Sequence, residues 1–328
     1  MVHLCDPTQP HYDGEMTTLR TICYFGPAST FTEEALRTQE DLAAFTHTPV
    51  GSISDVLATV ASGACDFGFV PLENAIEGTV NVTLDGLLFD HDLRIVREVI
   101  LDIHLHLLAA PGQTLESIDT VMSFPHALAQ CRAFLAANLP GVMTVPAEST
   151  ADAARFVSEE AEYVSSTAVI ASKLAGETYG LITVAEAIED HPDNQTRFVL
   201  VARNGVPAPT GHDRTAIVCF QDADRPGSLY GILGQFAARG INLTKLESRP
   251  TKQGLGEYCF IVEFDGHLAD PVIADCLTDL AATVARVKFL GSYPVAGLAA
   301  ASSRAEASAA RSDARQWVDG LLAERLEI

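Results

Sequence analysis

The stretch Arg203-Asn-Gly-Val-Pro-Ala-Pro-Thr-Gly-His212 divides this chain into two parts with different patterns of secondary structure. Its glycines and prolines interrupt both helical and strand periodicity, which is typical of a linker. Before it, β-prone runs alternate with helical runs, and after it the expected order is βαββαβ. A chain of 328 residues has room for two domains, at roughly 100–200 residues each. The sequence therefore predicts two domains joined by this linker.

The part before the linker has the pattern of an α/β domain. Thr21-Ile-Cys-Tyr-Phe25 is a β-prone run closed by Gly26-Pro27, and Ser29 or Thr30 can cap the helix that follows at 32–36. The other elements expected here are helices at 54–60, 127–138 and 151–160, and strands at 66–70, 101–108, 120–123 and 168–170. Alternation at this spacing predicts a largely parallel sheet.

The part after the linker is expected to form a small ferredoxin-like sandwich, because its elements follow the βαββαβ order. Its expected strands and helices are 215–220, 227–239 (helix), 241–247, 257–265, 271–283 (helix) and 287–291. The predicted boundaries are a disordered extension at 1–19, a first domain at 20–203, a linker at 204–213, a second domain at 214–295 and a tail at 296–328. Within the tail, Trp317, Leu321 and Leu322 lie about one turn apart, which favours a short docking helix at 314–326.

The charge and hydropathy of the chain exclude several classes of protein. A formal net charge of −22 argues against binding to nucleic acid or to an anionic membrane surface, because both need clustered Lys and Arg. No apolar run reaches the roughly 18 residues that could span a membrane. The first 15 residues lack the apolar segment of a signal peptide. We therefore expect a cytoplasmic protein.

The cysteines and histidines give no sign of a metal site. The seven cysteines are scattered without a C-x-x-C pair, which is typical of reduced, buried thiols. His104 and His106 are two residues apart on an expected strand and so face the same side, but no third ligand has a supporting spacing. The glycines after the first strand also lack G-x-G-x-x-G spacing. We expect neither a metal nor a dinucleotide cofactor.

A polar cluster precedes the apolar run Val199-Leu-Val-Ala202. It reads Asp190-His-Pro-Asp-Asn-Gln-Thr196-Arg197-Phe198. Open α/β sheets place their ligand chemistry at the ends of strands, so this cluster is a candidate site. The alternative is a solvated turn in which Thr196 is a local cap.

The segment Asn194-Gln-Thr196-Arg197-Phe198 resembles the Asn-x-Thr-Arg-Phe signature of the prephenate dehydratase family. Other phrases of that family follow in the expected order. They are Gly26-Pro-Ala-Ser-Thr30-Phe31, Val70-Pro-Leu-Glu73-Asn74-Ala-Ile-Glu77-Gly78, Ser123-Phe-Pro-His-Ala-Leu-Ala-Gln130-Cys131, Ser149-Thr150-Ala-Asp-Ala-Ala154 and Tyr179-Gly180-Leu181. The chain departs from the pattern at Ser29, where Gly is usual, and at Phe124 and His126, where His and Gln are typical. An imidazole at position 124 is therefore excluded from catalysis.

The resemblance implies a two-lobed domain similar to periplasmic binding proteins, with prephenate held in a cleft between the lobes. The reaction would be that of a carbon–oxygen lyase in phenylalanine biosynthesis: loss of CO2 and water from prephenate to give phenylpyruvate. Aromatisation drives this reaction, so no cofactor is implied. No chorismate mutase helices precede Thr21 in this sequence, and we expect a monofunctional enzyme.

The resemblance also carries residue roles. Thr196 would hydrogen bond to the departing hydroxyl or relay a proton to it, Arg197 would pair with a carboxylate of the substrate or of the protein, and Phe198 would pack against the ring. Asn74 would lie on the cleft wall, with Glu73 beside it as a positioning or proton-relay carboxylate. The other polar residues expected to bind substrate are Thr30, Ser123, Gln130, Ser149 and Thr150.

The second domain resembles an ACT domain, an amino-acid-binding regulatory module. The phrases that carry this resemblance are Asp224-Arg-Pro-Gly-Ser-Leu-Tyr-Gly-Ile-Leu233 and Gly240-Ile-Asn-Leu-Thr-Lys-Leu-Glu-Ser-Arg-Pro250. The unpaired amides after Pro226-Gly227 favour an anion such as an amino-acid carboxylate. Tyr230, Leu233 and Phe236 are expected to form a core-facing stripe. The residues expected to bind the effector are Gly227, Ser228, Leu229, Asn242, Leu243, Glu247 and Ser248.

For regulation, the resemblance implies that L-phenylalanine binds between ACT domains of two subunits and inhibits the enzyme allosterically by feedback. The protein would then be a homodimer or homotetramer, and a fragment ending near Gly205 would stay active without sensing phenylalanine. Three alternatives remain open at this point. The enzyme could act on arogenate, the chain could be a non-catalytic amino-acid sensor, or the ACT fold could pair subunits without sensing anything.

Overall fold

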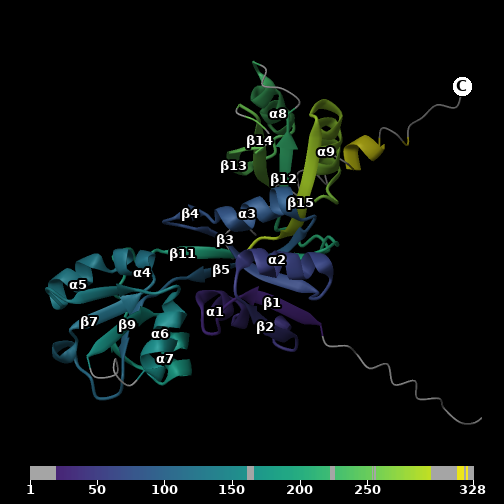
Figure 1. The fold of residues 1–328 in the computed structure, drawn as a ribbon. Helices are drawn as coiled ribbons and strands as arrows, with labels where there is room; N and C mark the ends of the chain where they lie inside the picture. Colours follow the sequence, from purple (N-terminus) through teal and green to yellow (C-terminus); the bar gives the residue numbers. More distant parts are fainter. Residues whose placement is uncertain are drawn as a thin grey trace, which may run out of the picture.

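Three sheets organise the chain (Figure 1). The computed structural model describes residues 20–160, 166–221, 226–252, 254, 256–296, 316–320 and 323. The extension predicted at 1–19 and most of the tail therefore lie outside the described residues. Gln316–Gly320 is helical, as expected, but Trp317 is 67% exposed, so its ring does not dock on the rest of the molecule.

The first sheet, here called lobe 1, has the order β2-β1-β3-β11-β5, with β4 paired to β3. Its strands are β1 Thr21–Phe25, β2 Thr46–Val50, β3 Phe67–Asn74, β4 Gly78–Thr79, β5 Arg94–Asp102 and β11 Gln195–Ala202. Its helices are α1 Phe31–Arg37, η1 Glu40–Leu42, α2 Ile53–Ser62, α3 Asn81–Asp85 and the π-helix η2 Gly86–Asp90. β11 runs antiparallel to both of its neighbours, so the prediction of a largely parallel sheet is wrong. The sheet is mixed because β11 returns to lobe 1 from another part of the molecule.

That other part is the second sheet, here called lobe 2, with the order β10-β6-β9-β7-β8. Its strands are β6 His106–Ala109, β7 Thr120–Ser123, β8 Met143–Pro146, β9 Thr167–Ala171 and β10 Ile182–Ala185. Its helices are η3 Leu115–Ser117, α4 Pro125–Gln130, α5 Arg132–Asn138, α6 Thr150–Glu159 and α7 Lys173–Tyr179. The single helix expected at 127–138 is interrupted at Cys131, whose φ of −114° and ψ of 15° are not helical.

The chain crosses between the lobes twice, after β5 and before β11. The two crossing segments are joined by backbone hydrogen bonds, from Ile103 N to Asn194 O at 2.8 Å and from Ile188 N to Leu105 O at 2.8 Å. The crossing divides the strand expected at 101–108 into the end of β5 and the start of β6. Pro71, expected to end a strand, instead lies inside β3 opposite Phe198, where the register shifts.

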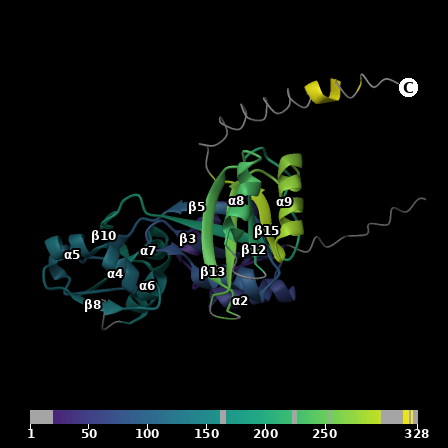
Figure 2. The same cartoon turned by 90° about the horizontal axis from the view of Figure 1, so that it is seen from above.

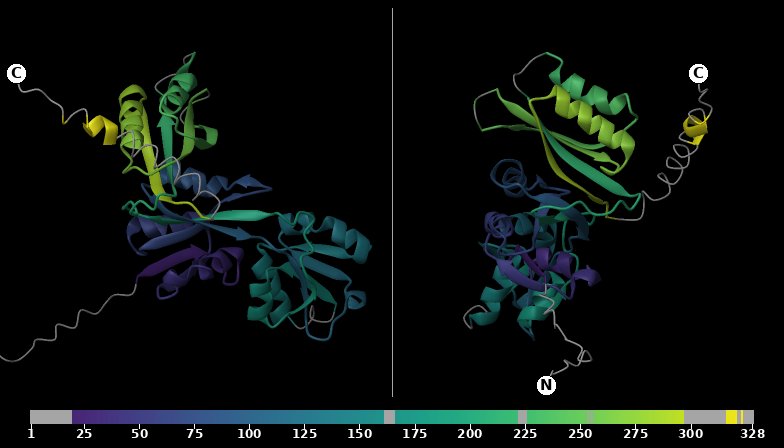
Figure 3. Two further views of the ribbon diagram at one scale, coloured as in Figure 1. Left: turned by 180° about the vertical axis from the view of Figure 1, so that it is seen from behind. Right: turned by 90° about the vertical axis from the view of Figure 1, so that its right-hand side faces the viewer.

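The third sheet is antiparallel, with the order β13-β14-β12-β15 that the βαββαβ pattern predicts. Its elements are β12 Asp213–Phe220, α8 Ser228–Ala237, β13 Leu243–Pro250, β14 Tyr258–Asp265, α9 Pro271–Thr283 and β15 Arg286–Pro294. Both helices cover one face of the sheet, and the other face is turned toward lobe 1 (Figures 2 and 3).

Lobe 1 and the third sheet share one apolar core. Leu87 and Ile95 of lobe 1 belong to the same buried cluster as Ile261 of β14. β15 lies so close to β5 that a Cβ atom on Gly291 would stand 2.2 Å from Ile95 O. A fragment ending near Gly205 would expose this core to water, and the shared core therefore argues against the expectation that such a fragment works alone.

Candidate functional site

A hydrogen-bonded group of side chains joins lobe 1 to lobe 2 beside the crossing segments. Thr196 is paired with Asn74 across β11 and β3, and Asn74 Nδ2 donates to Thr196 Oγ1 at 2.9 Å. Asn74 Nδ2 also donates to Asn194 Oδ1 at 2.9 Å, and Asn194 Nδ2 donates to Gln130 Oε1 of α4 at 3.2 Å. We call Asn74, Gln130, Asn194 and Thr196 the amide relay.

The backbone fixes the direction of this relay. Asn74 Oδ1 accepts from the N–H groups of Ile76 and Glu77, both at 3.0 Å, so its Nδ2 must face Thr196 and Asn194. Thr196 Oγ1 therefore accepts a hydrogen bond from a neutral amide. No described residue accepts from the Thr196 O–H, which can therefore donate to a third group. A hydroxyl held in this way can donate to an oxygen that leaves a substrate.

Asn194 is a relay residue to which the sequence analysis gave no role. Its buried side chain links Asn74 to Gln130 and so connects the two lobes. Its position as the first residue of the Asn-x-Thr-Arg-Phe phrase was the available signal.

A second contact between the lobes joins His126 Nδ1 to Glu77 Oε2, at 3.0 Å. The hydrogen bond from His126 is the main reason that the pKa of Glu77 is lowered, and Gln130 adds to the effect. The ring of His126 stacks on that of Phe124, with centroids 5.3 Å apart. Phe124 and His126, the two departures from the family pattern in the phrase that begins at Ser123, thus lie beside the relay.

Arg197 and Glu73 do not join the relay, contrary to the prediction that Glu73 lies along the cleft. Successive side chains of a strand point to opposite faces, so Arg197 points away from the face of Thr196, and its partner Glu73 does the same. Arg197 Nε donates to Glu98 at 2.7 Å and Nη1 donates to Glu263 of β14 at 2.8 Å. Arg197 thus takes the second of its two expected partners, a carboxylate of the protein. Glu73 lies 3.2 Å from Lys245 Nζ of β13.

Phe198 also differs from its prediction. Its ring is buried in the core of lobe 1 and stacks on Phe69, with centroids 5.6 Å apart. Alternation puts Phe198 on the same face of β11 as Thr196, but at this position that face is covered by the apolar core of lobe 1, which includes Leu36 and Leu200. The Phe198 ring is enclosed by this core and cannot pack against a bound substrate ring in this position.

The residues expected to bind substrate have local roles in the structure. Thr30 is the N-cap of α1 and Ser149 is the N-cap of α6, where Thr150 is the first helical residue. Ser123 is buried and donates to Ile170 O at 2.6 Å. Of this set, only Gln130 is hydrogen bonded to the relay. Ser29, in the first phrase, has φ of +67°, a left-handed conformation that favours Gly.

Neither histidine of the expected pair has a metal-like environment. His104 Nδ1 lies 2.9 Å from Glu189 Oε1, and His106 Nδ1 accepts from Ala187 N at 3.2 Å. Burial lowers the pKa of His106. Within the part of the chain that the structure describes, no three His, Cys, Asp or Glu side chains gather as metal ligands. The six described cysteines are free and buried.

The expected effector residues fall into two groups. Gly227, Ser228 and Leu229 line a pocket of about 500 Å³ at the start of α8, with Phe260 as part of its wall. Tyr230 also lines it and is 81% exposed, so the prediction that it faces the core is wrong; the core positions of this helix are Ile232 and Phe236. Asp224 and Arg225 lie outside the described residues.

The other four expected effector residues lie away from this pocket. Asn242 donates to Asp265 Oδ2 at 2.9 Å, and Leu243 packs against the core beneath α8. Ser248 is exposed on the edge strand β13. Glu247 points to the opposite face of the sheet and accepts from Thr79 Oγ1 of lobe 1 at 2.8 Å, which corrects its expected role.

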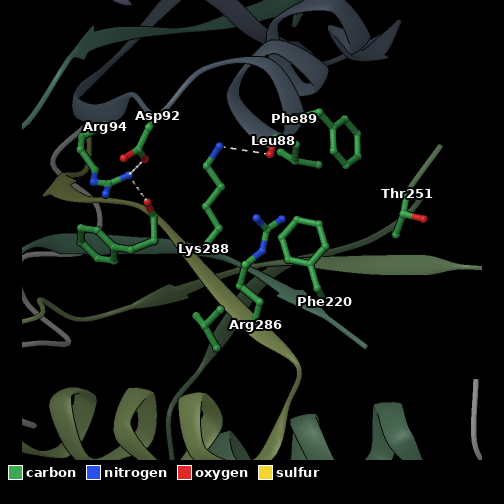
Figure 4. Close-up of a pocket in the computed structure, with 10 residues that line it drawn as sticks. Leu88, Phe89, Asp92, Arg94, Phe220, Thr251, Arg286 and Lys288 are labelled. Atoms are coloured by element: carbon green, nitrogen blue, oxygen red, sulfur yellow. Dashed lines mark hydrogen bonds and ion pairs between the residues drawn. The ribbon is translucent and has the colours of Figure 1, made fainter. Parts of the chain in front are cut away.

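A larger hollow of about 620 Å³ lies between η2 and β5 on one side and β12 and β15 on the other (Figure 4). Its cationic side chains already contact groups of the protein. Lys288 Nζ donates to Leu88 O at 3.1 Å, and Arg94 donates to Asp92 and to Phe289 O, both at 2.7 Å. Arg286 stacks over the Phe220 ring at 3.9 Å. No predicted site residue lines this hollow, so it is separate from the amide relay.

No described helix is long and apolar enough to cross a membrane.

Comparison with known proteins agrees with this architecture. The family model for prephenate dehydratase matches residues 22–206, and the model for the ACT domain matches residues 215–282. The prephenate dehydratase of Mycolicibacterium vanbaalenii is 40% identical over 92% of this chain and 97% of its own length. The bifunctional chorismate mutase/prephenate dehydratase of Pseudomonas aeruginosa is 41% identical over 84% of this chain and 74% of its own length.

A solved structure is similar over nearly the same span. The prephenate dehydratase from Arthrobacter aurescens, in complex with L-Phe, has a TM-score of 0.78 and 40% sequence identity, and the match covers 92% of this chain and 99% of that one. With a family model that spans more than half of its length and relatives at this level of identity, the chain belongs to the prephenate dehydratase family, with an ACT domain after the dehydratase domain.

Proposed function

We propose that this chain is a carbon–oxygen lyase that converts prephenate to phenylpyruvate, with the substrate bound between lobe 1 and lobe 2. The observation that carries the proposal is the fixed direction of the Asn74–Thr196 hydrogen bond, which leaves the Thr196 O–H free to donate. Family membership supplies the reaction.

The reaction breaks two bonds that join ring carbons to their substituents. The bond to the ring carboxylate breaks to release CO2, and its electron pair moves into the ring. The bond from C4 to its hydroxyl then breaks, and that oxygen leaves as water after it takes up one proton. Aromatisation of the ring drives both steps, so the protein's tasks are to orient the substrate and to supply the proton.

Thr196 is the residue that we assign to the departing oxygen. A threonine hydroxyl is a weak acid, so it acts by donating a hydrogen bond and by passing on a proton that it regains from water. The relay surrounding it consists of neutral amides, and the Glu77 carboxylate beside the relay is held by His126. For the two carboxylates of prephenate we assign the start of α6, where Ser149 and Thr150 stand and where free backbone N–H groups favour an anion.

We further propose that L-phenylalanine is the effector and binds at the start of α8. Gly227, Ser228 and Leu229 line the pocket there, and the amides that open this helix favour a carboxylate. The related Arthrobacter aurescens protein was solved in complex with L-Phe. Asn242, Leu243 and Ser248 lie outside this pocket, and we assign them to the pocket of a second subunit in a homodimer or homotetramer. Inhibition requires that phenylalanine bind the less active state more tightly.

An assay of the full chain tests this function. Phenylpyruvate formation is measured with prephenate, phenylalanine formation with arogenate, and each rate is compared with a sample without enzyme. We expect kcat/KM to favour prephenate, and added phenylalanine to lower the rate. If only arogenate is converted, the substrate is arogenate and not prephenate. If phenylalanine binds but neither compound is converted, the chain is an amino-acid sensor.

A further inference from the structure

The two faces of β11 connect the proposed reaction centre to the ACT sheet. Thr196 takes part in the amide relay on one face, and the next residue, Arg197, points to the third sheet on the other face. The two residues share a peptide bond. Any displacement of Arg197 is therefore transmitted to the backbone of Thr196, without a flexible segment between them.

Arg197 is held by groups from both domains. Within lobe 1, its Nε donates to Glu98 Oε2 at 2.7 Å. From the third sheet, Glu263 of β14 accepts from Nη1 at 2.8 and 3.1 Å, and Tyr293 of β15 accepts from Nη2 at 2.9 Å through its hydroxyl. Arg214 of β12 closes the group by donating to Glu98 Oε2 at 2.8 Å. We call these five residues the Arg197 cluster.

The Arg197 cluster is enclosed by protein. The Arg197 side chain is 10% exposed, Glu263 is 5% exposed, and Glu98 and Tyr293 are fully buried. Burial alone would lower the pKa of Arg197, but Tyr293 and the carboxylates of Glu263 and Glu98 outweigh it, so the pKa is raised. The guanidinium stays charged, and the two arginines and two glutamates of the cluster balance. Glu73 Oε2 also lies 3.6 Å from Arg197 Nη1, and its charge is balanced by Lys245 Nζ at 3.2 Å.

Such a cluster adds little to the stability of the fold, but it fixes one arrangement of its side chains. A buried ion group gains little over a packed apolar one, because desolvation offsets the Coulomb attraction, whereas loss of one partner leaves a charge unpaired. Arg197 has three donor directions in one plane, and each is occupied by a different residue, two of them from the third sheet. The orientation of its side chain, and with it the register of the β11 end, is thus set partly by the ACT sheet.

We propose that Tyr293 and Glu263 are positioning residues for the dehydration: through Arg197 they hold the end of β11 so that Thr196 is aligned with the departing hydroxyl. This rests on the proposed function of Thr196. It also gives the ACT domain a direct route to the reaction centre, because a change in the third sheet moves two of the three groups that hold Arg197.

The test uses Tyr293→Phe in the full chain, with Thr215→Val as the matched control. Each substitution removes one buried hydroxyl from the third sheet, but among the described residues the Thr215 hydroxyl bonds to Gly266 O and Ser292 Oγ and not to the Arg197 cluster. Melting temperatures are expected to fall by similar amounts. We expect Tyr293→Phe to lower kcat about tenfold or more with KM within about twofold, because a 1 Å misplacement costs on the order of 100-fold. Thr215→Val is expected to keep wild-type kcat.

A kcat for Tyr293→Phe equal to that of Thr215→Val would overturn the proposal, since the hydroxyl would then matter only for stability. A second variant, Glu263→Gln, removes the charge but keeps the shape, and its kcat should fall in the same way.

Hydrogen exchange of the β11 amides separates this proposal from the proposed function. We expect faster exchange at 195–198 in Tyr293→Phe than in wild type or Thr215→Val, and this readout does not depend on turnover. If exchange increases but wild type does not convert prephenate, the positioning link stands and the reaction is wrong. If wild type is active and exchange is unchanged, the positioning link is wrong.

Discussion

Two adjacent residues of β11, Thr196 and Arg197, lie in environments of opposite character. On the Thr196 face, neutral amides connect lobe 1 to lobe 2 through hydrogen bonds of fixed direction. On the Arg197 face, four charged side chains and a tyrosine connect lobe 1 to the ACT sheet. One strand therefore carries both the proposed reaction centre and the contact with the regulatory domain.

Because of this difference, substitutions on the two faces of β11 should have different effects. In the proposed function the relay receives a substrate with two carboxylates, and a surface of neutral amides with a hydroxyl donor suits it. The Arg197 face is filled by the third sheet, and its charges are balanced within the protein. Loss of a group from the first face should therefore affect turnover, and loss from the second should affect stability and alignment.

The largest expected effect is on the Arg197 face. Arg197→Met leaves Glu98 and Glu263 without their main partner in a buried place, which should lower the free energy of unfolding by about 3–5 kcal/mol. Urea unfolding measures it. The control is Arg155→Met, which removes two ion pairs from a side chain that is 42% exposed and should cost at most about 1 kcal/mol. Equal losses for the two variants would mean that the Arg197 cluster is an ordinary surface network.

The next effect is expected in the relay. Asn194→Leu removes the hydrogen bonds that link Asn74 to Gln130, so the connection between the lobes beside Thr196 is lost, and kcat should fall about 10- to 100-fold. Steady-state kinetics with prephenate measure it. Asn138→Leu is the control, because among the described residues the Asn138 side chain donates to Phe134 O within α5 and not to the relay. The relay has no catalytic importance if the two variants turn over at the same rate.

The stability of the protein should depend on pH through the carboxylate of Glu33, which accepts a hydrogen bond from Ser29 N. Burial raises the pKa of Glu33, but hydrogen bonds from Ser29 N and Tyr24 and the nearby Arg37 outweigh it, so the pKa is lowered below the ordinary 4.5. A lowered folded-state pKa stabilises the protein above the unfolded-state value and ceases to do so as pH falls through the folded-state value. Wild type should therefore be more stable than Glu33→Gln at pH 7, with a gap that shrinks below about pH 4.5. A gap that stays constant down to pH 3.5 would show that the carboxylate charge contributes nothing.

The smallest expected effect concerns backbone strain. Ser29 has φ of +67°, which costs a residue with a Cβ atom roughly 1–2 kcal/mol relative to glycine. Ser29→Gly relieves this strain but gives the unfolded chain more freedom, so a net gain of up to about 1 kcal/mol is expected. Thermal unfolding measures it, with Ser62→Gly in the exposed end of α2 as a control that should lose stability. A loss of stability in Ser29→Gly would show that its side chain is needed.

Much of the fold could be predicted from local pattern. The second domain has the predicted βαββαβ order, and α9 has the predicted bounds of 271–283, because each element carries its own periodicity and turn residues. The pairing of β11 between β3 and β5 could not be predicted, since it depends on a chain that leaves lobe 1 and returns. The same crossing divided the strand expected at 101–108.

The site was predictable in part. Two of the family phrases contained Thr196 and Asn74, and the structure brings these two residues together. Strand alternation already implied that Arg197 faces away from Thr196, and the sequence analysis did not use it. Glu263 and Tyr293, which contact Arg197 from the third sheet, lie 66 and 96 residues from it in the sequence. No local sequence pattern could therefore reveal these contacts.

The central claim is that the hydroxyl of Thr196 acts on the departing oxygen, and a pair of substitutions tests it most directly. Phenylpyruvate formation from prephenate is compared for wild type, Thr196→Ser and Thr196→Val, with melting temperatures as a check on folding. Thr196→Ser keeps the hydroxyl and should keep kcat within about tenfold of wild type, whereas Thr196→Val keeps the shape and should lose at least about 10²-fold. Equal turnover by folded Thr196→Ser and Thr196→Val would contradict the claim.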